Sequence, residues 1–586
     1  TTTISAGTLQ LGDGTSGKDG TIAGASIVNN ANLTYNRFGT TSYGGVISGT
    51  GTVTKLGAGT QTLSGANTYT GGTTVSAGTL RLVNSASGDA IRGSDPAHDY
   101  VVASGATLEF NRTTGGTENI NRFNLSGAGT FKTSGTLGIV QTSLGSTVAM
   151  GSGALFHVES GSYQFGAGGL GDWSSNLSDM QVDSGATFDG AATPTVIDAL
   201  NGSGTVLTGG GITLGVDNGS GTFSGVIGNS SSGGSAFSIT KAGSGTQTLS
   251  GANTYTGSTT VSAGTLKLQG DAFFTQARNY SIASDAVLNL DAGAGIAVGT
   301  TAISGNGTLL ITGGALVAGA AGRGLTLSLG SGALIDIAAG GTMYNGGWSA
   351  INWNSNLADL NVDGVLNVAD GQNVKVDALT GSGTISKSQA GTVTLQLGVD
   401  NGSGTFSGII ENGSGAIAFT KEGSGTQTLT GTNTYTGATT VNAGTLYVNG
   451  ALGDTNVSVS ADASLGGIGI LGGDLTFDGL SYLDIVDIGD ALAITGSVTF
   501  GSGFGLDNIT GWDYQNAVLG TYTLLSGSSI SLANMDNVGL ANALTLTNGN
   551  QAYFQTGSLQ VVIAIPEPSA AVIGGLGLLL LLRRRR

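Results

Sequence analysis

Apolar and polar residues alternate in short runs along most of the chain, and Gly, Asn, Asp or Ser break these runs every few residues. In TTVSAGTLRL, at 73 to 82, Val75 and Ala77 are expected on one face, Gly78 allows a bend, and Leu80 and Leu82 resume the inward alternation. The residues expected to point outward are Thr74, Ser76, Thr79 and Arg81. No long helical periodicity precedes the C-terminal tail, so the pattern predicts an all-β chain of short strands joined by turns.

Internal repeats organise the strands. Three segments match almost letter for letter: TKLGAGTQTLSGANTYTGGTTVSAGTLRL at 54 to 82, TKAGSGTQTLSGANTYTGSTTVSAGTLKL at 240 to 268, and TKEGSGTQTLTGTNTYTGATTVNAGTLYV at 420 to 448. The chain begins TTTISAGTLQL, which matches the end of this motif, so we expect its start to be a truncated repeat.

A longer duplication lies between these copies. AHDYVVASGATLEF at 97 pairs with ARNYSIASDAVLNL at 277, DWSSNLSDMQVD at 172 with NWNSNLADLNVD at 352, and LGVDNGSGTFSG closes both units at 214 and 397. A unit of about 180 residues was therefore copied whole. Coils of roughly 20 to 30 residues, stacked at about 4.8 Å, would pair every backbone group with a neighbouring coil.

The three short segments resemble the autotransporter-associated β-strand repeat, with its core G-x-N-T-Y-T-G-x-T-T-V-x-A-G-T-L. That resemblance implies a right-handed parallel β-helix on an exported surface protein. We expect residues 1–450 to form the repeat-built helix and 451–565 a β-rich region that continues or caps it. Asn67, Asn253 and Asn433 lie 180 or more residues apart, so they cannot form one stacked ladder.

Charge excludes one class of partner. The net charge is -17, and four of the 19 basic residues are the terminal Arg583 to Arg586. A nucleic-acid binder needs the opposite sign, because phosphate contacts supply most of its affinity. The absence of cysteine from the sequence excludes disulfides and thiolate metal sites.

The C-terminal tail, PEPSAAVIGGLGLLLLLRRRR, has its own pattern. From Ala570 to Leu582 an apolar helix would be about 20 Å long, short for a bilayer core of about 30 Å. Arg583 to Arg586 would remain cytoplasmic. The tail is similar to the PEP-CTERM sorting signal, which implies recognition of Pro566, Glu567 and Pro568 by an exosortase-type enzyme and transfer to the cell surface or matrix. A plain C-terminal membrane anchor is the alternative.

Candidate catalytic and metal-binding residues are few. Neither of the two histidines, His98 and His157, is retained in the second copy, where Arg278 and Asp336 stand instead. Asp217 and Asp400 precede Asn-Gly, which predicts a turn more readily than a Ca²⁺ ligand. Three further carboxylates, which we interpret as solvated strand residues, are Asp484, Asp487 and Asp490.

Trp173 and Trp353 occupy matched positions, with Trp348 nearby and Trp512 further on. Exposed aromatic rings could stack on sugars, but packing inside the coils is the plainer interpretation.

These patterns predict an exported structural or adhesive β-helix that is not an enzyme and needs no cofactor. The expected partners are an exosortase-type enzyme, exopolysaccharide or surface glycans, and the membrane before processing. Two alternatives remain: a β-helix lyase or hydrolase of matrix polysaccharide, which needs close carboxylates, and a membrane-anchored stalk or autotransporter-type passenger.

Overall fold

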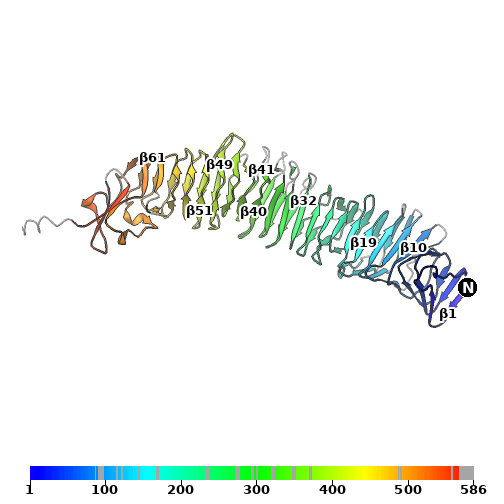
Figure 1. Cartoon of the computed structure of the whole chain (residues 1–586). Coiled ribbons are helices and arrows are strands. Elements are labelled where there is room, and N and C mark those ends of the chain that lie inside the picture. Colours follow the sequence, from blue (N-terminus) through cyan, green and yellow to red (C-terminus); the bar gives the residue numbers. More distant parts are fainter. Residues whose placement is uncertain are drawn as a thin grey trace, which may run out of the picture. The chain divides into compact units, whose positions relative to one another are not determined.

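The computed structural model contains short strands that stack side by side in parallel ladders (Figure 1). The chain divides into two compact units, Thr1–Leu334 and Ile335–Arg586. Strand β40 (Leu334–Ile337) begins at this division. The structure describes all residues except 86–87, 90–97, 114–115, 121–122, 136–137, 143–144, 166–170, 231–235, 271–277, 292–295, 298–300, 314, 319–323, 346–350, 369–371, 486–487, 489–490, 556–558 and 567–586.

Most strands of the first unit belong to four parallel ladders. The longest contains β5 (Thr40–Tyr43), β8 (Thr60–Leu63), β10 (Thr79–Ser85), β13 (Thr107–Arg112), β16 (Thr130–Ser134), β19 (Leu155–Val158), β21 (Asp179–Val182), β24 (Leu200–Gly202), β27 (Gly221–Phe223), β30 (Thr246–Leu249), β32 (Thr265–Gln269), β34 (Val287–Asp291) and β37 (Thr308–Gly313). The second contains β2 (Thr8–Leu11), β4 (Asn32–Asn36), β7 (Thr52–Leu56), β9 (Thr73–Val75), β12 (His98–Val102), β15 (Phe123–Gly127) and β18 (Thr147–Met150). The third contains β23 (Thr195–Ile197), β26 (Ile212–Leu214), β29 (Ile239–Lys241), β31 (Thr259–Val261), β33 (Asn279–Ile282), β36 (Thr301–Gly305) and β39 (Leu325–Leu329). The fourth contains β14 (Gly116–Ile120), β17 (Gly138–Thr142), β20 (Ser162–Phe165), β22 (Thr187–Asp189), β25 (Thr205–Thr208) and β28 (Val226–Asn229). The shorter elements are β1 (Thr2–Ile4), β3 (Ser26–Asn29), β6 (Val46–Ser48), β11 (Gly88–Asp89), β35 (Ile296–Ala297) and β38 (Ala315–Ala318).

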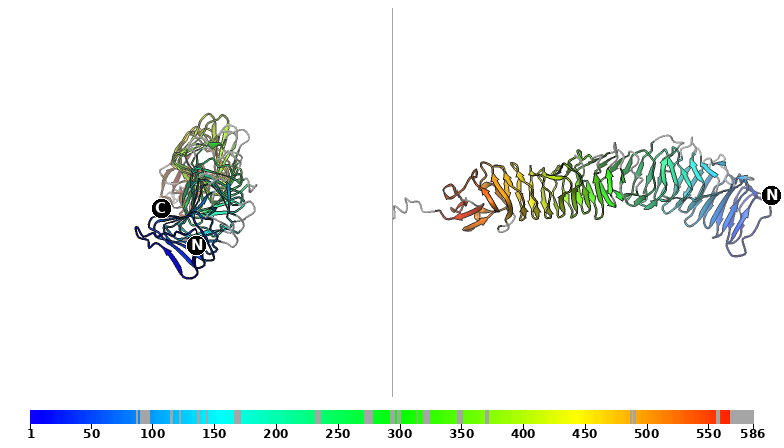
Figure 2. Two further views of the ribbon diagram at one scale, coloured as in Figure 1. Left: turned by 90° about the vertical axis from the view of Figure 1, so that its right-hand side faces the viewer. Right: turned by 90° about the horizontal axis from the view of Figure 1, so that it is seen from above.

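The second unit repeats this architecture, and Figure 2 shows its yellow and orange strands stacked at regular intervals. Its main ladder contains β44 (Val374–Val376), β47 (Thr392–Leu397), β50 (Ala416–Lys421), β53 (Thr439–Val441), β56 (Val457–Val459), β59 (Leu475–Phe477), β61 (Leu492–Phe500) and β64 (Leu525–Ser531). A second ladder contains β48 (Gly404–Phe406), β51 (Thr426–Leu429), β54 (Thr445–Val448), β57 (Ser464–Gly466), β60 (Tyr482–Asp484) and β62 (Ile509–Thr510). A third contains β41 (Thr342–Asn345), β43 (Val365–Asn367), β46 (Thr384–Lys387) and β49 (Ile409–Asn412), and β42 (Asp359–Val362) pairs with β45 (Leu379–Thr380). The short strands β52 (Thr432–Asn433), β55 (Ala451–Leu452) and β58 (Ile470–Leu471) join the sheet of the main ladder, because β58 pairs with β61.

The register of the ladders gives the length of a coil. Thr79 of β10 pairs with Thr60, 19 residues earlier, and with Thr107, 28 residues later. Each coil therefore lies within or just below the expected 20 to 30 residues, and the parallel β-solenoid architecture is confirmed. The handedness of the solenoid stays a prediction.

The interior positions of the first repeat follow the alternation of the sequence. Val75, Leu80 and Leu82 are buried, with exposed fractions of 1% or less. Ala77 is only partly buried, because it lies in the bend before Gly78, whose φ is +60°. The period-2 pattern applies within a strand and ends where the strand ends.

After β62, only β64 among the described strands continues the parallel stacking, and the other strands form a different sheet. An antiparallel sheet is formed by β63 (Gly520–Thr523), β67 (Gln560–Ala564), β66 (Gln551–Phe554) and β65 (Leu544–Thr545). The described helices are three short 3₁₀ turns, η1 (Leu506–Asn508), η2 (Tyr514–Asn516) and η3 (Leu540–Asn542). No helix in the described part of the chain is long and apolar enough to span a bilayer. The C-terminal hydrophobic helix expected at 570 to 582 lies outside the described residues.

Candidate functional surface of the repeat coils

Each copy of the repeat buries one lysine completely. These lysines are Lys55, Lys241 and Lys421, each with an exposed fraction of 0%. Lys55 Nζ donates to the carbonyl oxygens of Leu56 and Gly57 in its own turn, and to that of Ala77 in the next coil. The other two lysines make the equivalent three bonds. Burial lowers the pKa of Lys55 and of Lys421 to about 8, and it also lowers the pKa of Lys241. The lysine of the T-K-x-G sequence therefore joins two adjacent turns.

A buried glutamine bridges two coils in the second and third copies. Gln247 accepts a bond from the Leu200 amide (3.0 Å) and donates to the Leu200 carbonyl (2.9 Å), passing over Gly221 of the intervening coil. A Cβ on Gly221 would lie 2.5 Å from the Leu200 oxygen, so only glycine leaves room for this side chain. Gln427 makes the same pair of bonds to Leu379. The amide thus replaces a missing strand pairing.

The Asn and Tyr of N-T-Y-T also serve the interior. The asparagine oxygen accepts a bond from a backbone amide of the preceding coil in the pairs Asn67–Ile47, Asn253–Ile227 and Asn433–Ile410. The tyrosine hydroxyl bonds to the threonine four residues later in the pairs Tyr69–Thr73, Tyr255–Thr259 and Tyr435–Thr439. The Lys, Gln, Asn and Tyr that the copies share are therefore explained by contacts inside the solenoid.

The outward faces carry columns of hydroxyl groups. Ladder register aligns one column in each unit: Thr213, Thr240, Thr260, Ser281, Ser304 and Ser328 in the first, and Thr420, Thr440, Ser458, Thr476, Thr499 and Ser531 in the second. Thr54 and Thr74 of the first repeat begin a similar column, which continues with Val101, Ser126 and Ala149. Hydroxyls at the spacing of the strands, about 4.8 Å, form a regular polar surface.

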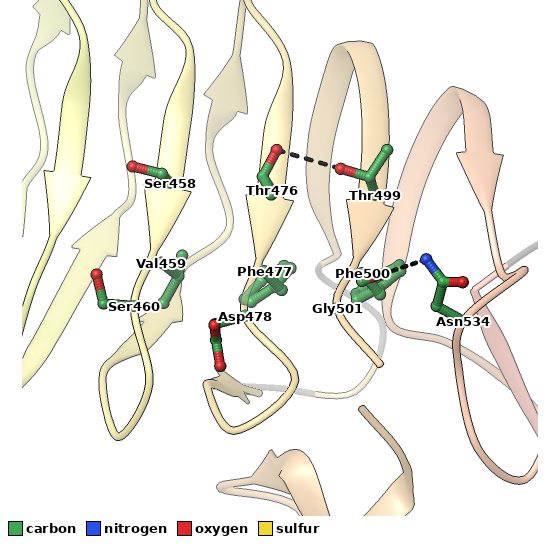
Figure 3. Close-up of a pocket in the computed structure, with 10 residues that line it drawn as sticks. All are labelled: Ser458, Val459, Ser460, Thr476, Phe477, Asp478, Thr499, Phe500, Gly501 and Asn534. Carbon is green, nitrogen blue, oxygen red and sulfur yellow. Dashed lines mark hydrogen bonds between the residues drawn. The ribbon is translucent and has the colours of Figure 1, made fainter. Parts of the chain in front are cut away.

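An open groove of about 490 Å³ lies beside the second column (Figure 3). The hydroxyls of Thr476 and Thr499 bond to each other at 3.1 Å, and Asn534 Nδ2 donates to the Phe500 carbonyl at 3.4 Å. Phe477 and Phe500 lie beneath with stacked rings, 5.4 Å between centroids. The groove is part of the solenoid surface and is lined mainly by hydroxyls and backbone.

The two histidines lie in different environments. His98 is packed between Tyr69 and Tyr100, and its Nε2 lies 3.0 Å from the Thr73 hydroxyl. Burial lowers the pKa of His98 to about 4. His157 Nε2 lies 2.9 Å from Asp183 Oδ2. The structure does not bring the two histidines together, since they occupy β12 and β19 of different ladders.

Asp217 and Asp400 lie in the turns that the sequence predicts, since Asn218 and Asn401 have φ values of +67° and +70°. Each turn is held by a carboxylate of the preceding coil. Asp198 accepts bonds from the Asp217 and Gly219 amides, both at 2.7 Å, and Asp377 does the same for the second copy. Sequence reasoning missed these two aspartates, although VIDAL and VDAL recur at matched positions.

The other acidic candidates do not converge. Asp484 accepts a bond from the Tyr447 hydroxyl at 2.5 Å, whereas Asp487 and Asp490 lie outside the described residues. Across the described ranges, no three His, Asp or Glu side chains gather as a metal site would require.

Trp173 and Trp353 are buried, which confirms that they pack inside the coils. Their rings are therefore not available to stack on sugars. Trp173 contacts Phe156 and Phe188 at centroid distances of 5.1 and 5.7 Å. Trp512 packs with Tyr514 and Tyr522. Trp348 lies outside the described residues.

Pro566 is exposed directly after β67. The other sorting and membrane candidates, Glu567, Pro568, Ala570, Leu582, Arg583 and Arg586, lie outside the described residues.

Residues 53–82, 239–268 and 419–448 match the family described as the passenger-associated-transport-repeat. These segments coincide with the three copies of the repeat, so the resemblance to an autotransporter-associated β-repeat is supported there. Comparisons with curated proteins and with solved structures gave no match. The PEP-CTERM resemblance stays a prediction.

Proposed function

We propose that the chain is an exported structural or adhesive β-solenoid of a bacterial cell surface or extracellular matrix. One observation carries the proposal: the repeat uses its shared Lys, Gln and Asn to join coils and its Tyr to brace the turn, and it leaves columns of hydroxyls outside. Such a surface binds weakly at each contact and gains by multivalency. The passenger-repeat match agrees with export.

Retention of polysaccharide tests this role. Cells that produce the protein should hold more of their own polysaccharide than cells that lack it, and the purified chain should sediment with that polysaccharide. Equal retention by both kinds of cell would contradict the proposal.

Our sorting proposal rests on the sequence of the tail. An exosortase-type enzyme would recognise Pro566, Glu567 and Pro568, and the Arg cluster would be removed. Mass spectrometry of the protein from its native cells should find a C-terminus near Pro566. A mature chain that still ends in Arg586 would instead indicate a membrane-anchored stalk.

We further propose that the chain binds glycans and does not cleave them. The packing of His98 between Tyr69 and Tyr100, and the separation of the two histidines on different ladders, support this view, because they leave no pair of imidazoles facing one substrate. Incubation with the native polysaccharide should leave its size distribution unchanged in gel filtration. Shortening would favour the lyase or hydrolase alternative.

A further inference from the structure

The second unit contains a groove of about 330 Å³ whose lining differs from the equivalent surface of the first unit. Its polar lining includes Asn354, Lys375, Gln396 and Glu422, and Leu357 lies at its edge with 38% of its surface exposed. Gly398 and Gly423 contribute backbone without side chains. The groove therefore combines the apolar side chains of Leu357 and Val399 with several hydrogen-bonding groups.

The duplication supplies the matched surface. Lys375 pairs in register with Gln396, and Gln396 with Thr420. In the first unit the same column reads Val196, Thr213 and Thr240. Ala242 stands there in place of Glu422, and Ser174 in place of Asn354. The second copy thus has a cation, an amide and a carboxylate where the first has none.

Two of these groups lack partners. Lys375 Nζ makes no hydrogen bond or ion pair with the described residues, whereas the other seven lysines all interact. Gln396 Oε1 is buried without a hydrogen-bond donor in the described part of the chain. Glu422 accepts one bond, from Asn442 Nδ2 at 2.9 Å. An ammonium without a counter-ion favours a ligand that supplies one. The Gln396 amide lines the same groove, and none of its hydrogen bonds with the described residues uses up its Nε2 donor.

We propose that this groove binds an acidic saccharide, the uronate residue of a polysaccharide. Its carboxylate pairs with Lys375, the Gln396 amide in the lining donates from Nε2 to a sugar oxygen, and the apolar face of the sugar packs on Leu357. The net charge of -17 opposes an anion at long range, but at 0.15 M salt charges beyond about 8 Å are largely screened. The inference rests on the proposed role as a glycan-binding surface protein and names the site and the sugar class.

Calorimetry of the full chain with hexagalacturonate, at 0.15 M salt, tests the site. Lys375→Val with Gln396→Thr installs the residues of the first copy, and we expect Kd to rise at least about tenfold. Lys18→Val, which removes a surface cation distant in sequence, should leave Kd unchanged. Cellohexaose, which lacks carboxylates, should bind at least about tenfold more weakly than hexagalacturonate. No binding by the wild-type chain, an unchanged Kd in the double variant, or equal binding of cellohexaose would each overturn the proposal.

Transplantation gives a gain-of-function test. Val196→Lys with Thr213→Gln in the first unit should raise the stoichiometry from one hexagalacturonate to two. An unchanged stoichiometry in a variant with wild-type thermal unfolding would overturn the assignment to these residues. Retention of cellular polysaccharide, measured in parallel, separates the two proposals. Retention without hexagalacturonate binding would support the surface role and overturn this site. Hexagalacturonate binding without retention would support the site and overturn the surface role.

Discussion

The two copies of the duplicated unit fill equivalent interior positions with different side chains. The first has aromatic rings where the second has aliphatic groups, and each of these residues has an exposed fraction of 1% or less. The pairs are Phe110–Leu290, Phe131–Leu309, Phe156–Ile335 and Phe188–Leu366. Phe156 lies 4.9 Å from Phe131 and 5.0 Å from Tyr163, between ring centroids. Trp173 and Trp353 stay unchanged and buried. The coil framework therefore tolerates the exchange of aromatic for aliphatic side chains at these four core positions.

The exterior differs as well. In the first copy Arg81, Glu109, Lys132 and His157 form one column, and ion pairs join Arg81 to Glu109 (2.8 Å) and Lys132 to Glu159 (3.0 Å). The second copy replaces the last three members of the column with Asn289, Leu310 and Asp336. The pair of Lys132 with the exposed Glu159 contributes little free energy, whereas Glu109 is buried beside Arg81. The core, where all the compared residues are buried, is the better place to test the comparison.

Phe156→Ala should produce the largest effect. Removing a buried ring costs about 3 to 5 kcal/mol, and we expect Ile335→Ala to cost less, about 3 kcal/mol, because fewer atoms are lost. Urea unfolding followed by tryptophan fluorescence measures both, since Trp173 contacts Phe156 directly. An equal loss in the two variants would show that aromatic contacts add nothing to the first copy.

The buried lysines test a feature that the copies share. Because the pKa of Lys421 falls from 10.5 to about 8 on folding, the unfolded chain binds more protons between these pH values. Stability therefore rises with pH in this window, by about 3 kcal/mol in total, since a tenfold change in proton affinity corresponds to about 1.4 kcal/mol. The free energy of unfolding of the wild type relative to Lys421→Met should increase from pH 8 to pH 10.5. The same direction is expected for Lys241→Met, and a flat difference would contradict the burial argument.

His98 and its equivalent Arg278 should respond differently to acid. The pKa of His98 is about 4 in the folded chain and 6.5 ordinarily, so the unfolded chain binds more protons between pH 4 and 6.5. The first copy then loses about 2 to 3 kcal/mol as the pH falls from 6.5 to 4. Arg278 is buried and donates to the Tyr255 carbonyl, and it replaces the imidazole whose protonation drives the loss in the first copy. Amide hydrogen exchange should show the strands around His98 opening first, and equal opening around Arg278 would argue against this mechanism.

Gly221→Ala and Gly404→Ala should cause the smallest losses of stability, and the two losses should be equal. The new Cβ would approach the carbonyl oxygens of Leu200 and Leu379, so each variant should lose about 1 to 2 kcal/mol in urea unfolding. Gly151→Ala is the control, because its Cβ would meet nothing closer than 3.8 Å. Unequal losses would show that the glutamine bridge differs between the copies.

Much of the fold was predictable because strand alternation and repeats are local signals. Val75, Leu80 and Leu82 are buried as the pattern indicates, and the Asp-Asn-Gly turns at Asp217 and Asp400 have the positive φ at asparagine that their sequence favours. The candidate surface was less predictable. The partners of Lys55 and Gln247 lie up to 47 residues away, and sequence alone gives no register.

The sequence by itself determined the short strands, the turns, the duplicated unit and the stacking of coils, because each depends on residue spacing within one coil or on the identity of whole copies. The parallel arrangement was implied by the resemblance of the three repeat segments. Tertiary structure alone decided which polar side chains face inward and which groups meet in the groove around Lys375. Those contacts join residues of different coils. Stacking register sets them, and register depends on the packing of every coil on its neighbour.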